Sequence, residues 1–492
     1  MAGHNTYQTI GIKRLCCLQL IMIAISAYAQ EVKMPVLDIH FDAEIVMNMS
    51  YANGSMKLTD EEGKVVELPA KFKTRGATAQ QYLMKPSLNM KLRTADYAEE
   101  ADSALLGMRS CSSWILDAMA IDRICMRNRV AFDIWNEFSK LPYETNFGSR
   151  NGTEGRFVEV YINDKYYGIY CLSDRINRKL LDLKKVKELD DGTMKVRGVL
   201  YKSGTQSILN QNEFAYNEDY TACVVEWHNA WELSFPEDYA SPEVWKPLQD
   251  AILKGSTKEY VKKYFFLENL ADYELHVTAL SIEDNMGHKN HYFSIRNINK
   301  DINAEDPDDA NRRRIVVTPW DLDTSLGGNY RGDNYNGNYT VWNIIEVAKN
   351  AFYPISVIHD DVTYQAILKQ RWIEGRKGAF SIKSVNQKLE KYRDLFIKSG
   401  AWQRMIDRFG VTSSGPMLVE DLTKEISLVE KWYEARFHEM DQYFGITDGI
   451  ENIGCAPLEI EHVVYDLNGR KVLNGQYGKG IVIRNGKKYF VK

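Results

Sequence analysis

The chain has few of the residue patterns that identify common enzyme classes. It contains no HExxH or GxSxG pattern, and its cysteines and histidines do not have the spacing of a zinc site. The phosphate-binding loop GxxxxGK[ST] is also missing, as is the glycine-rich loop of ordinary protein kinases. Hydrolases of these types are therefore not favoured, and nucleotide binding has no motif of its own.

The chain also has no strong excess of positive or negative charge. Lys and Arg number 62 against 67 Asp and Glu, which gives a net charge of −5, and the basic residues are dispersed along the chain. Nucleic-acid-binding proteins normally concentrate basic residues in one patch, so we expect no nucleic-acid partner. No apolar run after residue 29 is long enough to cross a bilayer, so we expect no integral membrane segment in the mature chain.

The first 29 residues have the order of an export signal. Lys13 and Arg14 are followed by an apolar stretch over residues 15–25 and by the small residues Ala27 and Ala29. The apolar stretch is too short to span a bilayer as a helix, although a retained membrane anchor is the alternative. We expect cleavage near Ala29 and export to the periplasm, the cell surface or the extracellular space.

Cysteine is sparse, with five residues after the export signal: Cys111, Cys125, Cys171, Cys223 and Cys455. Export would permit a disulfide, for which Cys111 and Cys125 are the nearest pair. The interpretation that we favour is buried free thiols, because a core of this size needs no disulfide.

Hydrophobic patterning divides the mature chain into a β-rich part, a helical part and a short tail. We expect one α+β domain over residues 30–445, a linker over 446–456 and a small β-module over 457–492, which contains three Asn-Gly turn signals. The pattern is largely helical over residues 364–444, and Gly445 ends it.

Two shorter patterns make specific predictions. Residues 157–162 and 166–172 are apolar stretches that flank a short polar turn, which predicts a β-hairpin. Apolar residues recur at helical spacing over residues 112–138, which predicts a helix with Ser112 or Ser113 as its N-cap.

The most informative feature is a pair of acids, Asp321 and Asp323, directly after the apolar run 315–319. We predict that this run is a buried strand. Residues i and i+2 point the same way on an extended backbone, so both carboxylates could reach one cation. A solvated turn without a ligand is the alternative.

A second polar cluster, residues 284–290, lies upstream and is followed by a predicted strand over 291–296. Protein kinases place their catalytic base and magnesium ligands in the same order: an Asp, then an Asn, then a strand pair that ends in an acid. Residues 301–314 connect the two predicted strands, and we interpret them as a solvated hairpin loop.

Five motifs in this order resemble the spore coat protein H (CotH) kinase family over residues 35–445. They are Lys73-Thr74-Arg75-Gly76 with Lys85-Pro86, Arg127-Asn128, the stretch 158–170, the cluster 284–292, and Pro319-Trp320-Asp321-Leu322-Asp323. The resemblance implies an atypical protein-kinase-like fold with a β-rich N-terminal part and a helical C-terminal part. It also implies transfer of the ATP γ-phosphoryl group to Ser or Thr of a protein, with Mg²⁺ as the second cofactor.

The same resemblance implies roles for individual residues. Asp284 is the candidate catalytic base. Three residues are candidate Mg²⁺ ligands: Asp321, Asp323 and Asn290. Three others are candidates for binding ATP, two at its phosphates and one near its adenine: Lys85, Lys91 and Asp174.

The chain departs from the family pattern near the nucleotide positions. Thr74 precedes Arg75, Ala77 follows Gly76, and Asp174 stands where the family usually has a glutamate. The tail over residues 465–488 resembles short C-terminal β-modules of exported Bacteroidetes proteins, which implies a surface or secretion role.

Two classes of function remain open. One is an exported protein kinase. The other is a catalytically silent, adhesin-like protein that binds a surface ligand on the same scaffold, which the scarcity of ATP outside the cytoplasm and the 29 Tyr and 10 Trp residues favour. A metal-dependent hydrolase is a third interpretation with less support. The sequence does not identify the protein substrate or the surface ligand.

Overall fold

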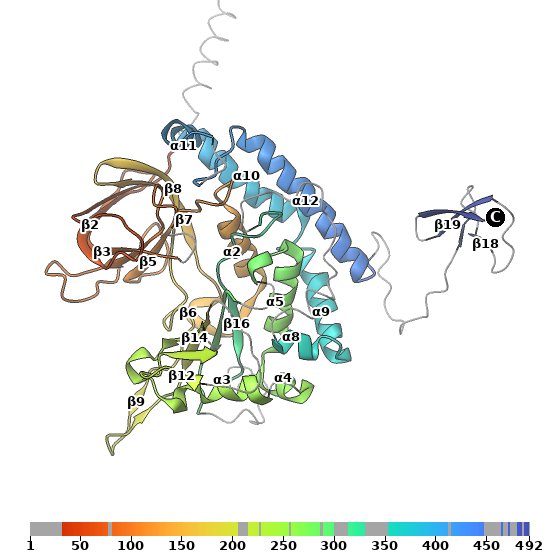
Figure 1. Ribbon diagram of the computed structural model, residues 1–492, viewed down its shortest axis with the longest axis horizontal. Helices are drawn as coiled ribbons and strands as arrows, with labels where there is room; N and C mark the ends of the chain where they lie inside the picture. Colours follow the sequence, from red (N-terminus) through yellow and green to blue (C-terminus); the bar gives the residue numbers. More distant parts are fainter. Residues whose placement is uncertain are drawn as a thin grey trace, which may run out of the picture. The chain divides into compact units, whose positions relative to one another are not determined.

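The computed structural model describes residues 32–76, 81–204, 215–225, 228–254, 257–285, 289–299, 313–329, 353–411, 415–446, 464–465, 471–472, 480–484 and 487–491. Over these residues the chain combines several β-sheets with nine α-helices (Figure 1), which confirms the α+β class. It separates into two compact units, residues 1–440 and 441–492. The described helices include none that is both long and apolar enough to cross a membrane.

The N-terminal part forms a closed barrel of seven strands. In the order of their pairing these are β1 (Val36–Phe41), β2 (Ala52–Thr59), β3 (Val65–Thr74), β4 (Leu88–Leu92), β5 (Ser113–Asp117), β8 (Lys165–Ser173) and β7 (Gly155–Ile162). All neighbours are antiparallel except β1 and β7, whose parallel pairing closes the barrel. Alternate residues such as Leu37 and Ile39 are fully buried in its core. The barrel was not among the expected features.

The hairpin predicted over residues 157–172 is confirmed as β7 and β8. The turn residues Asn163 and Asp164 have φ values of 49° and 63°, which are the left-handed conformations that a tight two-residue turn requires. The Asn163 side chain also accepts a hydrogen bond from the Phe41 N–H at 3.1 Å and donates one to the Phe41 carbonyl at 3.0 Å. One asparagine therefore both makes the turn and joins the hairpin to β1.

The predicted helix over residues 112–138 is wrong in its first half. Residues Ser113–Asp117 form strand β5, and α2 begins only at Arg127 and ends at Phe138. Between them, Asp122 accepts hydrogen bonds from the N–H groups of Met126 and Arg127, both at 2.8 Å, and so caps the start of α2. The apolar residues of a buried strand and those of a helix follow each other at spacings that together match one helical stripe.

A second sheet has six strands. Their order is β12 (Ala215–Tyr216), β13 (Ala222–Val225), β14 (His228–Phe235), β11 (Val199–Ser203), β15 (His291–Ile295) and β16 (Val316–Pro319). The predicted strands after residues 290 and 314 are therefore confirmed as β15 and β16, which pair antiparallel and are buried throughout. Residues 301–312 of the predicted loop between them lie outside the described residues.

Strand β16 is the last strand of this sheet, and two asparagine side chains cover its outer edge. Asn269, on α5 (Leu267–Leu280), accepts a hydrogen bond from the Val317 N–H at 2.7 Å and donates one to the Val317 carbonyl at 3.0 Å. Asn151 donates a second hydrogen bond to the same carbonyl at 2.9 Å. The backbone groups that a further strand would use are thus occupied.

The remaining helices are α3 (Pro242–Lys254), α4 (Lys258–Tyr264), α8 (Tyr353–Ile358), α9 (Val362–Gly375), α10 (Ile382–Lys398), α11 (Ala401–Phe409) and α12 (Leu422–Tyr443). The last four confirm the helical pattern predicted over residues 364–444. Helix α9 packs against α5, and α11 packs against β8 of the barrel. Gly445, with φ of 65°, follows the end of α12 as expected.

Strand β6 (Lys140–Arg150) has 11 residues and follows α2. The short elements are the strand pair β9 (Lys187–Glu188) and β10 (Met194–Lys195) and the 3₁₀ turns η2 (Glu237–Tyr239) and η3 (Glu283–Asn285). The C-terminal unit contains a four-stranded sheet in the order β18 (Lys471–Val472), β17 (Val464–Tyr465), β19 (Gly480–Arg484) and β20 (Lys487–Val491). The expected export signal, the linker after residue 446 and the three Asn-Gly turns lie outside the described residues.

The four described cysteines after the export signal are all buried free thiols, as we expected: Cys111, Cys125, Cys171 and Cys223. Burial raises the pKa of the Cys125 thiol to about 12, so it stays protonated and unreactive at neutral pH. Cys455 lies outside the described residues.

Candidate functional site

Four carboxylates gather at the ends of three elements. Asp321 and Asp323 follow β16, Asp284 lies in η3, and Asp117 ends β5. Burial raises the pKa of Asp323 well above its usual range, and the negative charges of Asp321, Asp117 and Asp284 raise it further. The structure therefore brings together three predicted site residues, Asp284, Asp321 and Asp323, and adds Asp117 to them.

Asp321 is exposed, whereas Asp117, Asp284 and Asp323 are half-buried. The pKa of Asp321 is nevertheless raised, first by loss of hydration and then by Asp117 and Asp284, while Arg75 and Lys289 oppose this rise. Its φ of 55° is a left-handed conformation that is rare for a residue other than glycine. The backbone is not extended here, so the premise that the acids point the same way along a strand is wrong, although their charges do interact.

Asp284, the candidate base, is held by two contacts. Its carboxylate accepts an ion-pair contact from the Lys289 ammonium at 2.8 Å, and its backbone N–H donates to the Thr324 hydroxyl at 3.1 Å. The second contact joins η3 directly to the turn that carries Asp323. Lys289 was not predicted as a site residue, although it belongs to the same polar cluster, residues 284–290, as Asp284.

Asn290 is joined to the acidic turn by its backbone carbonyl and not by its side chain. Its carbonyl accepts the Trp320 N–H at 2.8 Å, whereas its side chain makes a long contact of 3.5 Å to Asn285. The Asn285 amide donates to the carbonyls of both Asn290 and Trp320, at 3.0 and 2.8 Å. Asn285, which was not predicted, therefore ties the start of β15 to the end of β16, and Asn290 takes a left-handed φ of 64° at this junction.

Asn128 connects the barrel to the acidic turn. Its amide N–H donates to the Asp117 carboxylate at 2.8 Å, and its carbonyl oxygen accepts the Leu322 N–H at 3.1 Å. One side chain at the start of α2 thus fixes the position of Asp117 and of the backbone between Asp321 and Asp323. The family motif contains Asn128, whereas Asp117 ends a strand that the helical prediction over residues 112–138 does not contain.

Arg75 brings positive charge to the site. Its guanidinium lies over the Trp320 ring, 5.5 Å from the ring centre, and its positive charge opposes the rise in the pKa of Asp321. Arg75 and Lys289 are thus cations next to a group of acids. The Arg75-Gly76 motif was the signal that could have identified this arginine as a site residue.

Lys85 is fully buried, close enough to Asp117 for their charges to interact. Its ammonium donates to the carbonyls of Ala118 at 2.5 Å and Ile169 at 2.8 Å, and it lies over the Tyr170 ring. Burial lowers the pKa of Lys85, while Cys125, Asp117 and Asp122 act in the opposite direction. Of the four acids, Asp117 is therefore the one on which this charge acts, and in this arrangement the ammonium does not face solvent.

The structure places Lys91 and Asp174 away from the four carboxylates. Lys91, on β4, lies over the Tyr51 ring at 5.2 Å. Asp174 is completely buried, where it accepts from Arg109 at 2.5 Å, from Arg150 at 2.9 Å and from the Glu154 N–H at 2.7 Å. These contacts hold the end of β8, and a nucleotide contact for either residue stays a prediction.

The donor set resembles that of a magnesium site in part. In the portion of the chain that the structure describes, no three Asp, Glu, His or Cys side chains are arranged so that they hold a metal ion. Mg²⁺, however, often takes only one or two carboxylates from a protein and the rest of its ligands from phosphates and water. The raised pKa values of Asp321 and Asp323 mark an excess of negative charge, which a bound cation would offset.

The fold and the site define an α+β protein with acids and two cations gathered where β5, η3 and β16 end. The model of the CotH kinase protein family matches residues 72–437, which is most of the chain. The chain therefore belongs to this family, as its motifs indicated. No curated protein matches the chain significantly.

Proposed function

We propose that this protein is an atypical kinase that transfers the γ-phosphoryl group of Mg²⁺-ATP to a Ser or Thr hydroxyl of a protein. The observation that supports this most is the meeting of Asp284 with the turn that carries Asp321 and Asp323, through the hydrogen bond of the Asp284 N–H to Thr324, in a chain of the CotH kinase family. Positioning and charge neutralisation supply most of the rate in phosphoryl transfer, and this cluster is suited to both.

Each residue has a distinct proposed role. Asp321 and Asp323 hold Mg²⁺, with Asn290 as a third ligand, and the bound ion neutralises charge on the ATP phosphates. Asp284 accepts the proton of the attacking hydroxyl, and its ion pair with Lys289 keeps the carboxylate in place. Arg75 is better placed than the buried Lys85 to meet a phosphate, because it lies beside the exposed Asp321.

We also propose that the architecture is a divergent kinase-like fold. The barrel would take the place of the N-terminal lobe, and the second sheet with its helices would take that of the C-terminal lobe. The order of Asp284, Asn290 and Asp321 around the strand pair β15–β16 supports this, because kinases carry their base and two metal ligands in the same order. Lys91 and Asp174 remain proposed ATP contacts at the barrel.

The proposed place of action is outside the cytoplasm. The basic, apolar and small-residue order of residues 1–29 supports export, and the tail after residue 457 supports a role at the cell surface. A kinase in this compartment would need ATP there, and its protein substrate would be exported as well.

A phosphate-transfer assay tests the proposal. Purified protein is incubated with γ-labelled ATP and casein, a generic Ser-rich protein, in the presence of Mg²⁺ or Mn²⁺. We expect metal-dependent labelling that falls by at least on the order of 10²-fold in Asp321→Asn, because the amide keeps the size but loses the charge. Asp407→Asn, at an exposed position of α11, is the matched control and should keep full activity.

Two outcomes would count against a kinase. Equal labelling by the wild type and Asp321→Asn would exclude Asp321 as a required metal ligand. No labelling by the wild type with either metal, together with unchanged attachment of Asp321→Asn to cells, would favour the surface-binding alternative.

A further inference from the structure

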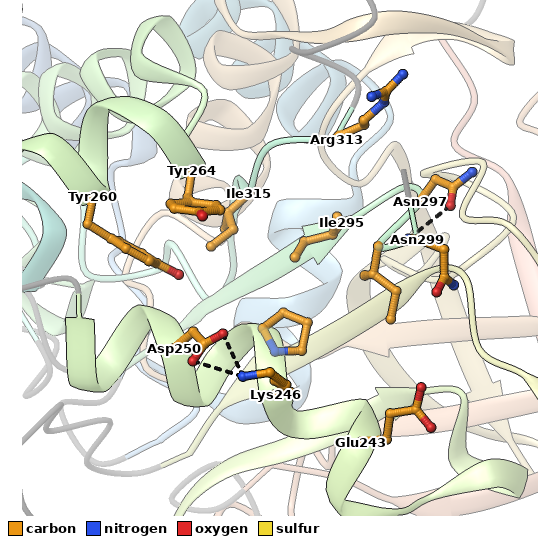
Figure 2. Close-up of a pocket in the computed structure, with 12 residues that line it drawn as sticks. Glu243, Lys246, Asp250, Tyr260, Tyr264, Ile295, Asn297, Asn299, Arg313 and Ile315 are labelled. Carbon is orange, nitrogen blue, oxygen red and sulfur yellow. Dashed lines mark hydrogen bonds and ion pairs between the residues drawn. The ribbon is translucent and has the colours of Figure 1, made fainter. Parts of the chain in front are cut away.

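A pocket lies at the far end of the strand pair that carries the acids (Figure 2). It is lined by Ile295, the last residue of β15, and by Ile315, which precedes β16. The acids follow the opposite end of β16, and a strand of this length separates its ends by roughly 13 Å. The pocket volume is about 290 Å³, which is near the lower limit of small-molecule sites. The chain thus has a second candidate binding site that the proposed kinase reaction does not use.

Two stacked tyrosines form one wall of this pocket. Tyr260 and Tyr264 lie four residues apart on α4, and their ring centres are 4.3 Å apart with an angle of 26° between the planes. Burial raises the pKa of Tyr260, so its hydroxyl stays protonated and can donate a hydrogen bond. The stacking holds both rings in place, so a ligand would meet a preformed aromatic surface.

Polar side chains form the other walls. Lys246 and Asp250, one turn apart on α3, make an ion pair at 3.0 Å. Asn297 accepts the Asn299 N–H at 3.3 Å, and the Asn299 side chain in turn donates to the carbonyl of Val196. These contacts fix amide and carboxylate groups around the space that Figure 2 shows between α3, α4 and the end of β15.

The charges of the lining residues balance. Glu243 and Asp250 are acids, Lys246 and Arg313 are bases, and so the lining carries no net charge at neutral pH. Phosphates, nucleotides and other strongly charged ligands would gain little here. A neutral ligand with several hydroxyl groups and one apolar face would use the tyrosine surface, the amides and the carboxylates together.

We propose that this pocket binds a neutral saccharide of one or two rings. The C–H face of a pyranose packs on the tyrosines, and its hydroxyls bond to Asn297 and Asp250. An extended peptide suits the site less well, because peptides usually take backbone hydrogen bonds from a strand edge. Asn269 already occupies the backbone groups of Val317 on the neighbouring edge.

Saturation-transfer NMR on the full-length protein tests this site, with maltose, cellobiose, lactose and N,N′-diacetylchitobiose as probes and Gly-Gly-Gly as the peptide control. We expect at least one disaccharide to show transfer to its ring C–H protons. Tyr264→Ala should weaken that binding by at least about fivefold, whereas Tyr264→Phe should keep it, because the ring face and not the hydroxyl makes the contact. Asn297→Ala, at a half-exposed position, should weaken it as well.

Tyr239→Ala, at an exposed tyrosine outside the pocket lining, is the matched control and should bind as the wild type does. Asp321→Asn should also bind normally, so failure of the kinase proposal and failure of this one are distinguishable. The proposal is overturned if none of the four disaccharides binds, if only the peptide binds, or if Tyr264→Ala and Asn297→Ala both bind as tightly as the wild type while circular dichroism shows them folded.

Discussion

Replacement of Asp323 by Asn should stabilise the metal-free protein. The folded-state pKa of Asp323 is raised by burial and by Asp321, Asp117 and Asp284, so the ionised carboxylate disfavours folding at neutral pH. Loss of this charge should increase the free energy of unfolding by about 1.4 kcal/mol for each pKa unit by which the folded value exceeds the unfolded one. An increase of about 1.4 kcal/mol would raise the melting temperature by roughly 2 °C.

The pH dependence has a defined sign. Because the folded pKa lies above the unfolded one, the penalty is absent below the unfolded pKa and is complete above the folded pKa. Wild type and Asp323→Asn should therefore have similar stability at pH 4, and the variant should be the more stable at pH 8. Scanning calorimetry in EDTA at both pH values measures this, with Asp407→Asn as the control for loss of an exposed acid.

Mg²⁺ should reduce or reverse the difference. An ion present at ten times its Kd stabilises the wild type by about 1.4 kcal/mol, and the variant should gain less because it has lost one candidate ligand. A lower melting temperature for Asp323→Asn in EDTA at pH 8 would refute the claim that repulsion dominates at this position. An equal gain from Mg²⁺ in both proteins would refute Asp323 as a metal ligand.

Four further predictions concern other parts of the chain. His276 is buried, and its pKa is lowered to about 4. Protonation of the unfolded state should therefore reduce the free energy of unfolding by on the order of 3 kcal/mol between pH 7 and pH 4. Calorimetric scans should show a smaller loss over this range for His276→Gln. Asn128→Ala should reduce the kcat of casein phosphorylation by at least about tenfold without unfolding the protein, because Asn128 positions both Asp117 and Leu322. An unchanged kcat would contradict this role. A chain truncated at Thr447 should keep one cooperative thermal transition, and loss of soluble protein would show that the tail completes the core. Protein from the native host should begin near residue 30 on N-terminal sequencing, and a sequence that starts at Met1 would rule out cleavage.

Features encoded by neighbouring residues were predictable. The β7–β8 hairpin followed from a polar turn between two apolar stretches, and Asn163 and Asp164 tolerate the left-handed backbone that the turn needs. The segments around Asp284 and Asp321 were predictable for a similar reason, since each is a short polar cluster next to an apolar strand. What could be placed from sequence was the order of these segments and the strands that carry them.

Features that depend on distant pairing were not predictable. The barrel closes through parallel pairing of Val36 with Glu159, and no local pattern encodes a contact over that separation. Asp117 was missed because the buried stretch Trp114–Leu116 fits helical as well as strand spacing when its partners β4 and β8 are unknown. The contact of Asn128 with Leu322 joins residues 194 positions apart, so only the folded chain shows that one side chain serves both.

The paired hydrogen bonds of Asn269 to Val317 also fix the register of strand β16. Because one side chain contacts both the N–H and the carbonyl of a single residue, β16 cannot slide without losing both bonds. A slip of two residues would keep the same face inward but would carry Asp321 about 7 Å along the strand, away from Asp284. A substitution of Asn269, on helix α5, would thus separate Asp321 from Asp284 without changing either acid.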